Sequence, residues 1–395
     1  MRRVPGTKLH NHTGESMSFP TPKRMTTRKV SVVVKRERNL GKRLERFLRK
    51  KIRSGPSLGD RKEDEAGWAS RVRNVFVDKQ IPAHKPIAIY AHFNPAGTVS
   101  QMVVEQLRVL KNEGFEIVFV TMSPVPADKV ALLENLICFG FERRSFGRDF
   151  GAWKDAWQHF RQQFVDAPEI LLTNDSILGP VRPFAPVMAS LRSIDEGVLG
   201  LTDSPDHSPH LQSYFLLFRG SKALLGLDLF FEQLRCSFNK KNMIERGELA
   251  LSTFLLGKKV PLYTLFSYEE IEAEYLNDRD LLRELMASAS IILKEFSLNE
   301  EKLLLSDDGK GIQGDFNWIR MRMKARLWSM VFNPTHFFWR HLVQVHNFPF
   351  IKTELVTLNP SYVFDAADWR EVINEDSPIT IDVLEEHLSL IMSGS

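Results

Sequence analysis

Three polar residues near the middle of the chain are well placed to do chemistry. Asn174, Asp175 and Ser176 directly follow an apolar run, residues 169–173, and offer an amide, a carboxylate and a hydroxyl. In open α/β sheets the ligand crevice lies just past the carboxyl ends of the strands. The pattern therefore predicts a buried strand that delivers these groups to a ligand. The alternative is a turn in which Asp175 caps the next segment.

A second polar group, Gly147-Arg148-Asp149, stands at the start of an expected helix. Its charged side chains are candidates for binding, although an Asp at this place can also cap the helix. Trp153 and Trp157 follow at i, i+4 spacing, which places them on one face of the helix. We expect both rings in the core.

A β-α-β unit should precede these groups. Residues 87–91 are predicted to form a buried strand, and residues 115–120 a second strand. Between them, Thr98 is predicted to cap a helix that ends near Gly114. A parallel, right-handed connection is the default for such a unit. The loop between strand and helix is a common nucleotide position, although it lacks a phosphate-binding glycine fingerprint. Its candidate binding residues are His92 and Asn94.

Further alternation of apolar and polar residues extends the α/β pattern to about residue 270, and a mostly helical pattern follows. We expect an arm over 1–80, an α/β domain over 81–270 and a helical region over 271–395. The other expected helices are 127–136, 184–191, 221–234 and 243–256, and the other strands are 137–141, 197–202, 211–218 and 260–266.

The N-terminal arm carries the basic charge of the chain. Residues 1–53 hold 17 Lys and Arg against three acids, whereas the remaining residues hold 36 against 46. Residues 1–37 are expected to be disordered, residues 40–52 to form a basic amphipathic helix, and residues 54–70 to form a polar linker. Such a helix suits an anionic membrane surface, the acidic body or a partner helix. Nucleic acid is not expected, because no aromatic stacking set accompanies the charge.

Composition indicates a folded protein of ordinary polarity, with 43% hydrophobic and 26% charged residues. The sequence predicts no transmembrane helix and no secretory signal, since no apolar region follows the basic start. Cys138 and Cys236 lie in apolar surroundings and are expected to be buried thiols, which favours a reducing compartment.

Six segments, in order over roughly residues 86–360, resemble the rhamnan synthesis protein F family, which is associated with bacterial rhamnose-containing surface polysaccharides. The chain departs from that family at Ser145, where an Asn is usual two residues before the glycine of GRD. The segments are IAIYAHFNPAGTVS, GRDFGAWKDAW, LLTNDSILGP, HLQSYFLLFR with the strand end at Asp203 before it, GELALSTFLLGK and NPTHFFWRHLVQVHNFPFIKTELVTLNP.

The resemblance implies a GT-A-like (Rossmann-like) α/β fold with a mostly parallel sheet, which binds a nucleotide sugar. Asp175 takes the place of the usual Asp-x-Asp motif and would bind Mg²⁺ or Mn²⁺, both of which prefer oxygen ligands. Because one carboxylate remains, metal-independent binding by cationic side chains is the alternative. The substrate-binding residues then expected are His92, Asn94, Gly147, Arg148, Asp149, Asn174, Ser176, His210 and Lys352.

Glycosyl transfer also needs a general base, and Glu248 fits the position at the start of a late helix, with Asp203 as its rival. The resemblance thus implies a glycosyltransferase, with rhamnosyl transfer from dTDP-rhamnose to a lipid-linked glycan as the specific expectation. It would act in the cytoplasm, at the inner face of the cytoplasmic membrane. The alternative is a non-catalytic module for glycan assembly or binding that retains the fold.

Overall fold

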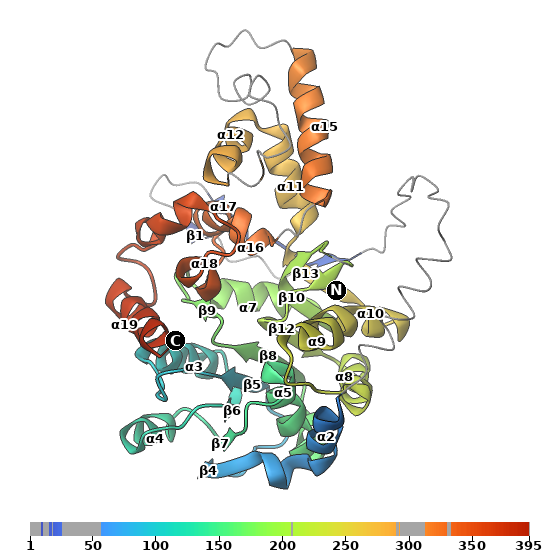
Figure 1. Ribbon diagram of the computed structural model, residues 1–395, viewed down its shortest axis with the longest axis vertical. Coiled ribbons are helices and arrows are strands. Elements are labelled where there is room, and N and C mark those ends of the chain that lie inside the picture. The colour runs from blue at the N-terminus through green and yellow to red at the C-terminus, as the bar shows by residue number, and fades with distance from the viewer. Residues whose placement is uncertain are drawn as a thin grey trace.

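The computed structural model describes residues 9–10, 16–17, 19–25, 57–206, 208–289, 292, 313–329 and 333–394. The expected disorder over residues 1–37 falls mostly outside these residues, and the expected amphipathic helix over 40–52 falls entirely outside them. The described part is an α/β fold with a mixed, mainly parallel sheet flanked by helices, and a helical C-terminal region (Figure 1). This confirms the expected fold class at that level.

The central sheet has ten strands, nine of them in the order β3-β13-β10-β12-β8-β5-β6-β7-β4, with β11 paired to β10. Antiparallel pairing occurs at the two edges, β3 and β4, and at β12 and β11. The strands are β3 (Lys23–Arg24), β4 (Val72–Asp78), β5 (Ile87–His92), β6 (Glu116–Thr121), β7 (Phe139–Arg143), β8 (Glu169–Asn174), β10 (Gly197–Ser204), β11 (His210–Leu211), β12 (Phe215–Arg219) and β13 (Leu262–Phe266).

Side chains alternate between two hydrophobic cores because successive strand residues point to opposite faces of the sheet. In β5, Ala88 and Tyr90 enter one core and Ile87, Ile89 and Ala91 the other. The first core is covered by α3 (Gln101–Asn112), α7 (Ala185–Leu191) and the C-terminal helices. The second is covered by α5 (Arg148–His159), α6 (Arg161–Val165), α8 (Ser221–Gln233) and α10 (Ala250–Gly257).

The strand order reverses direction between β5 and β8. From β5 the chain steps outward to β6 and β7 through α3 and α4 (Ala127–Leu133), and then returns to place β8 on the other side of β5. Both strands pair in parallel in the register Ala91 to Asn174. Their carboxyl ends therefore meet at a topological switch point, the usual ligand position in an open α/β sheet.

The C-terminal region contributes to the same edge of the fold. Its short strand β14 (Ile351–Lys352) pairs with β9 (Ile177–Leu178), immediately after the end of β8. In Figure 1 the helices α11, α12 and α15 project from the body, and α16–α19 run along one side of it. These helices are α11 (Tyr268–Asn277), α12 (Arg279–Ser288), α15 (Gln313–Ser329), α16 (Pro334–Phe337), α17 (Trp339–Gln344), α18 (Thr353–Thr357), η2 (Phe364–Val372) and α19 (Ile381–Ser393).

The predicted polar linker over residues 54–70 is wrong for its described part. Residues Leu58–Arg71 form helix α2, and β4 follows as an edge strand on β7. A capping box begins α2, since Ser57 Oγ accepts from the Asp60 amide and Asp60 accepts from the Ser57 amide. This charged helix has no clear apolar face, and it is stabilised by contacts with the rest of the fold. The predicted arm over 1–80 thus includes three elements that pack on the α/β body, β3, α2 and β4, and the expected disorder over 1–37 is wrong where β3 pairs with β13.

Three local predictions also need correction. The cap of α3 is Ser100, whose side chain accepts from the Val103 amide, and not Thr98. The strand predicted over 211–218 is two strands, β11 and β12, separated by a turn. The helix predicted over 243–256 is α9 (Lys240–Met243), a π-helix η1 (Ile244–Leu249) and α10.

A buried ion network fastens α2 to the body. The Asp155 carboxylate accepts from Arg71 Nε at 2.9 Å and from Arg143 Nε at 2.8 Å, and all three side chains are at most 2% exposed. Asp155→Ala would leave two guanidinium groups buried without their shared anion. We expect it to lower the free energy of unfolding by about 3–5 kcal/mol, the usual cost of breaking a buried ion pair. Urea titration measures this loss; the exposed Asp166→Ala serves as the control, and equal midpoints would contradict the prediction.

The remaining expectations concern the cysteines, the tryptophans and membrane spans. Cys138 and Cys236 are buried free thiols, and burial raises the pKa of each thiol to about 11. Trp153 and Trp157 lie in the core, as expected. In the part of the chain that the structure describes, no helix has the length and apolar character needed to span a membrane.

Candidate functional site

The candidate site begins where β5 and β8 end side by side. The Asp175 carboxylate, one residue beyond β8, accepts a hydrogen bond from the Phe93 amide, one residue beyond β5, at 2.8 Å. This contact crosses the switch point and aims the carboxylate at the loop after β5. Asp175 is therefore not simply the cap of its own turn. Asn174 makes that turn, because its Oδ1 accepts from both the amide and the hydroxyl of Ser176.

Asp149 joins this group from the first turn of α5. Its Oδ2 accepts from Asn174 Nδ2 at 2.8 Å, and the N-cap residue of the helix is Gly147, which has no side chain to make a cap bond. The turn before it is sharp, since Gly147 (φ 75°) and Arg148 (φ 52°) both have left-handed backbones. A Cβ at Gly147 would also lie 2.8 Å from the Cys236 sulfur. Backbone strain of this kind persists where the surroundings fix it, often at functional sites.

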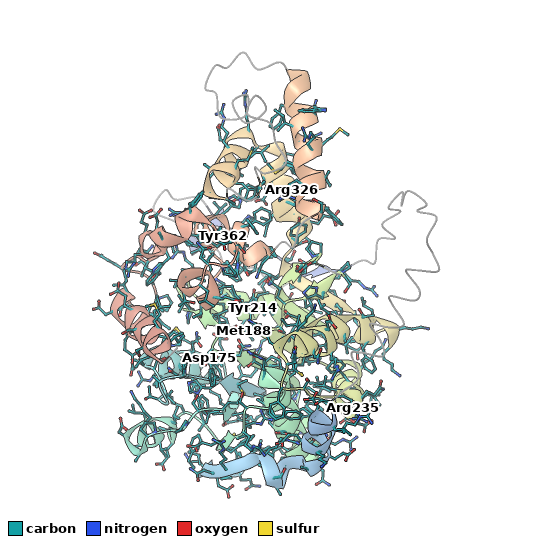
Figure 2. All side chains as sticks on the ribbon, viewed as in Figure 1. Asp175, Met188, Tyr214, Arg235, Arg326 and Tyr362 are labelled. Carbon is teal, nitrogen blue, oxygen red and sulfur yellow. The ribbon has the colours of Figure 1, made fainter. Side chains whose placement is uncertain are left out.

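Lys352 brings a cation to the same place from the far end of the chain. Strand β14 pairs with β9, and Lys352 then donates to Ser176 Oγ at 3.0 Å. Its Nζ also lies 4.5 Å from the centre of the Tyr214 ring. The pairing thus places a lysine next to the turn that carries Asp175. Asp175 and Tyr214 both lie near the middle of the molecule in Figure 2.

Glu248 approaches from the π-helix η1. Its Oε1 accepts from the Ser213 amide at 3.0 Å, in the turn between β11 and β12. Gly247 allows this approach, because a Cβ there would lie 2.6 Å from the Phe150 ring on α5. The chain therefore places Glu248 close enough to Asp149 and Lys352 to act on the pKa of each. Short π-helical segments are frequent at functional sites.

Burial shifts the pKa of the ionisable groups in the cluster in the direction that disfavours their charged forms. Burial raises the pKa of Asp175 to about 8, the Phe93 amide opposes this rise, and the charge of Asp149 adds to it. Burial likewise raises the pKa of Asp149, against its hydrogen bond from Asn174. Burial lowers the pKa of Lys352, against the attraction of Glu248. A bound cation would replace the proton of Asp175, because carboxylates must ionise to ligate a metal.

A second polar group lies on the β5 side of Asp175. His92 is fully buried, contacts Thr121 Oγ1 through Nδ1 at 2.9 Å, and places Nε2 3.9 Å from Asp175 Oδ2. Burial lowers the pKa of His92 to about 3, so this contact joins two neutral groups at pH 7. Among the described residues, the buried side-chain atoms without a hydrogen-bond partner include His92 Nε2, Asn94 Nδ2 and His387 Nε2. Such groups are rare in folded proteins and point to an absent partner.

Two of the residues expected in the site, Asp203 and His210, make their described hydrogen bonds outside the cluster, although the charge of Asp203 helps to raise the pKa of Tyr214. Asp203 accepts from the Tyr268 amide at 2.8 Å, at the start of α11, which gives it a structural role there. Burial raises the pKa of Asp203 to about 6. His210 contacts the Ser208 carbonyl oxygen through Nδ1 and belongs to β11. Of the two candidate bases, Glu248 is the one whose charge acts on the cluster formed by Asp149 and Lys352.

Three residues near the site were missed from the sequence. Tyr214 lies under Lys352, and His336, whose pKa burial lowers to about 3, is close enough to be affected by the Lys352 charge. His387 contacts Ser100 Oγ at 2.7 Å and lowers the pKa of His92. Tyr214 and His336 each lie in a segment that carries the family resemblance, HLQSYFLLFR and NPTHFFW, whereas His387 lies in none of them.

A cavity of about 690 Å³ lies elsewhere, between α18, η2 and α19. Its walls are mainly apolar, and the ion pair of Arg370 with Glu385 crosses part of it. None of the residues in the Asp175 cluster lines it. We take the cluster as the candidate site because convergent charged groups, and not volume, perform polar chemistry.

Comparisons with known proteins find similarity over part of the chain. The family model for rhamnan synthesis protein F matches residues 117–292, a shorter stretch than the 86–360 inferred from motifs. An uncharacterized protein, y4gN of Sinorhizobium fredii, is 22% identical over 210 residues. That alignment covers 52% of this chain and 54% of the relative, so the chain spans about half the length of the protein that it matches. The family match supports the resemblance over the matched segment.

Proposed function

From the match of residues 117–292 to rhamnan synthesis protein F, we propose that this chain is a glycosyltransferase with a GT-A-like fold. It moves a sugar from a nucleotide-sugar donor to a growing surface polysaccharide. Asp149, Asp175 and Glu248 lie inside the matched segment, whereas His92 and Lys352 lie outside it. The proposal therefore also rests on the contacts that bring the residues inside the matched segment together with those outside it.

One observation carries the proposal. Asp175, Asn174 and Ser176 end β8 at the switch point, and Lys352 donates to Ser176 there at 3.0 Å. A carboxylate and a cation side by side suit a diphosphate, which is bound either through a divalent ion or directly by a positive charge. Mg²⁺ or Mn²⁺ would fit the oxygen donors of Asp175 and would supply charge neutralisation to the leaving diphosphate. Lys352 supplies part of that neutralisation from the protein itself.

Glu248 is proposed as the general base. Its Oε1 is held by the Ser213 amide, which leaves Oε2 to accept the proton of the acceptor hydroxyl. The hydroxyl oxygen forms a bond to the anomeric carbon, the bond from that carbon to the diphosphate oxygen breaks, and the electron pair leaves with the diphosphate. Asp149, hydrogen-bonded to Asn174, would orient the sugar. Positioning and charge stabilisation of this kind supply most of the rate in such sites.

The unpaired nitrogens of His92, Asn94 and His387 are proposed to meet the nucleoside part of the donor. The donor is expected to be dTDP-rhamnose, and the acceptor a lipid-linked glycan at the inner face of the cytoplasmic membrane. The basic arm over residues 1–53 would bind the anionic membrane surface there.

The proposal is tested by a screen of nucleotide sugars with and without Mn²⁺, using the wild type and Glu248→Gln. The wild type is expected to bind at least one donor and to hydrolyse or transfer it. Glu248→Gln should retain donor affinity within about threefold and lose roughly 100-fold or more in turnover, since general base catalysis contributes on the order of 10²–10⁴. Calorimetry measures binding, and nucleoside diphosphate release measures turnover.

Glu245→Gln is the matched control, because it changes an acid one turn earlier in η1. It should behave as the wild type. Donor binding without turnover in the wild type, in the presence of any glycan acceptor tried, would favour the non-catalytic assembly module instead. Equal turnover in Glu248→Gln and wild type would remove Glu248 from the mechanism.

A further inference from the structure

A second cluster of chemically active side chains lies outside the proposed donor site. Glu274 on α11 faces His341 on α17 and His346 just beyond the end of that helix. Glu274 Oε2 contacts His341 Nε2 at 2.8 Å and His346 Nε2 at 2.7 Å. The three ligand atoms lie within 4.8 Å of one another. Two imidazoles and a carboxylate thus converge on one point.

The surrounding packing holds the two imidazole rings in place. The His341 ring packs edge-on against Tyr275, with 5.0 Å between ring centres, and Tyr275 stacks on Phe338 at 4.7 Å. His341 is 7% exposed and His346 is 23% exposed, so both rings are held while the cluster remains open to solvent. His346 lies in the turn after α17, where its amide donates to the His341 carbonyl oxygen, and Asn347 after it has a left-handed backbone (φ 54°). The two imidazole ligands are therefore positioned before any ion arrives.

We infer that Glu274, His341 and His346 form a binding site for a Zn²⁺ ion. Zinc takes imidazole nitrogen at about 2.0–2.1 Å and carboxylate oxygen at about 2.0–2.2 Å, with tetrahedral geometry. Ligand atoms around such an ion lie roughly 3.4 Å apart, so shifts of less than about 1 Å open the cluster enough to admit it. Glu274 is 40% exposed and free to make this shift. Each imidazole would bind through Nε2 and keep its proton on Nδ1.

Three protein ligands leave a fourth position for water or for a group of a partner. Imidazole favours Zn²⁺ over Mg²⁺ and Ca²⁺, which prefer oxygen. This site is therefore chemically distinct from the oxygen-rich group at Asp175. It is also distinct in place, because Glu274 and both histidines lie on α11 and the α17 turn.

The ion would fasten the projecting helices to the body. Helix α11 carries Glu274, and its Glu272 accepts from Trp328 Nε1 of α15 at 2.7 Å. The α17 turn leads through residues 348–350 into β14, which carries Lys352. Bound zinc would thus join the base of the projection to the segment that completes the donor site.

The test titrates tag-free, full-length protein with Zn²⁺ and, for a visible signal, with Co²⁺. Wild type is expected to bind one Zn²⁺, to gain thermal stability and to show the absorption bands of tetrahedral Co²⁺. His346→Gln keeps an N–H donor for Glu274 but loses the imidazole ligand. Its Zn²⁺ affinity should fall by about 100-fold or more, since losing even an outer-shell partner costs roughly 10–100-fold.

Two controls separate this site from others. His84→Gln replaces an exposed histidine far from the cluster in sequence and should bind Zn²⁺ as the wild type does. Asp175→Asn removes the proposed hard-cation ligand and should leave the Co²⁺ bands unchanged. If Zn²⁺ binds equally to wild type and His346→Gln, or if wild type binds none, the inference is overturned. Neither result bears on the glycosyltransferase proposal.

Discussion

Asp175→Asn is expected to abolish glycosyl transfer and, at the same time, to make the protein more stable at alkaline pH. The loss of activity should reach roughly 100-fold or more, the usual scale for removing one electrostatic contact to the reacting group. The gain in stability follows from the burial that raises the pKa of Asp175 to about 8. An asparagine keeps an oxygen for the Phe93 amide and carries no charge at any pH.

The sign of the pH effect follows from proton binding. An aspartate ionises near pH 3.9 in the unfolded chain, so between about pH 4 and pH 8 the folded protein holds one proton more than the unfolded chain. Folding stability then falls as pH rises through this window, by up to about 1.4 kcal/mol for each pH unit at this residue. The Asp175→Asn variant does not lose folding stability in this way as pH rises. Its advantage in melting temperature over the wild type should be small at pH 5 and larger at pH 8.

Thermal melts of both proteins across pH 5–9, with donor transfer assays alongside, measure the two effects. Asp206→Asn, at a partly exposed aspartate beyond β10, is a suitable control for loss of one acid. Melting temperatures that differ by the same amount at every pH would contradict the raised pKa. Full transfer activity in Asp175→Asn would contradict the proposed role of the carboxylate.

Lys352→Met is expected to weaken binding of a nucleoside diphosphate by roughly 30-fold, about 2 kcal/mol, while binding of the nucleoside alone changes little. Methionine keeps the apolar stem against Tyr214, and the backbone pairing of β14 with β9 does not depend on the side chain. The variant therefore removes the charge and the hydrogen bond to Ser176 Oγ, and it keeps the strand pairing and the apolar contact. Calorimetry with nucleoside, monophosphate and diphosphate should show a loss that grows with each phosphate.

Lys240→Met is the matched control, because Lys240 is exposed and pairs with Glu354 at 3.6 Å without contacting Ser176. It should bind all three ligands as the wild type does. An equal loss for nucleoside and diphosphate in Lys352→Met would mean that Lys352 supports the fold of the site rather than the diphosphate. The wild type could retain glycosyl transfer without Mn²⁺ while Lys352→Met does not. That result would show that the lysine neutralises the diphosphate charge in place of a metal.

The sequence predicted the elements in which the pattern of apolar residues shows which side chains are buried. Strands β5, β6 and β8 are continuous apolar runs, and α3 and α8 have clear apolar faces, so local patterns sufficed. Helix α2 has no such pattern. It is stabilised instead by the capping box at Ser57 and by the hydrogen bond from Arg71 to Asp155. Its Gly67, with φ 73°, also reads as a loop residue. The run LQSYFLLF looked like one strand because a turn among its apolar residues leaves no punctuating Gly or Pro.

Most residues of the candidate site could be named from the sequence, but the contacts that bring them together could not. Asp175, Asp149 and Glu248 follow from strand ends, helix starts and the family resemblance. The contact of Lys352 with Ser176 spans 176 residues and depends on the pairing of two very short strands. Local periodicity carries no information about such a pairing. The buried nitrogen of His387 is equally remote, since α19 reaches His92 only through the packing of the folded chain.

The pairing of β14 with β9 has a consequence for biosynthesis. A nascent chain can complete the β5–β8 half of the sheet long before residue 352 leaves the ribosome, since domains fold as their segments emerge. During that interval the Asp175 turn exists without its lysine. Closing so long a loop adds entropy cost and slows the final step. Under the proposed function, affinity for the diphosphate would therefore be gained abruptly and late, and unfinished chains would not sequester donor.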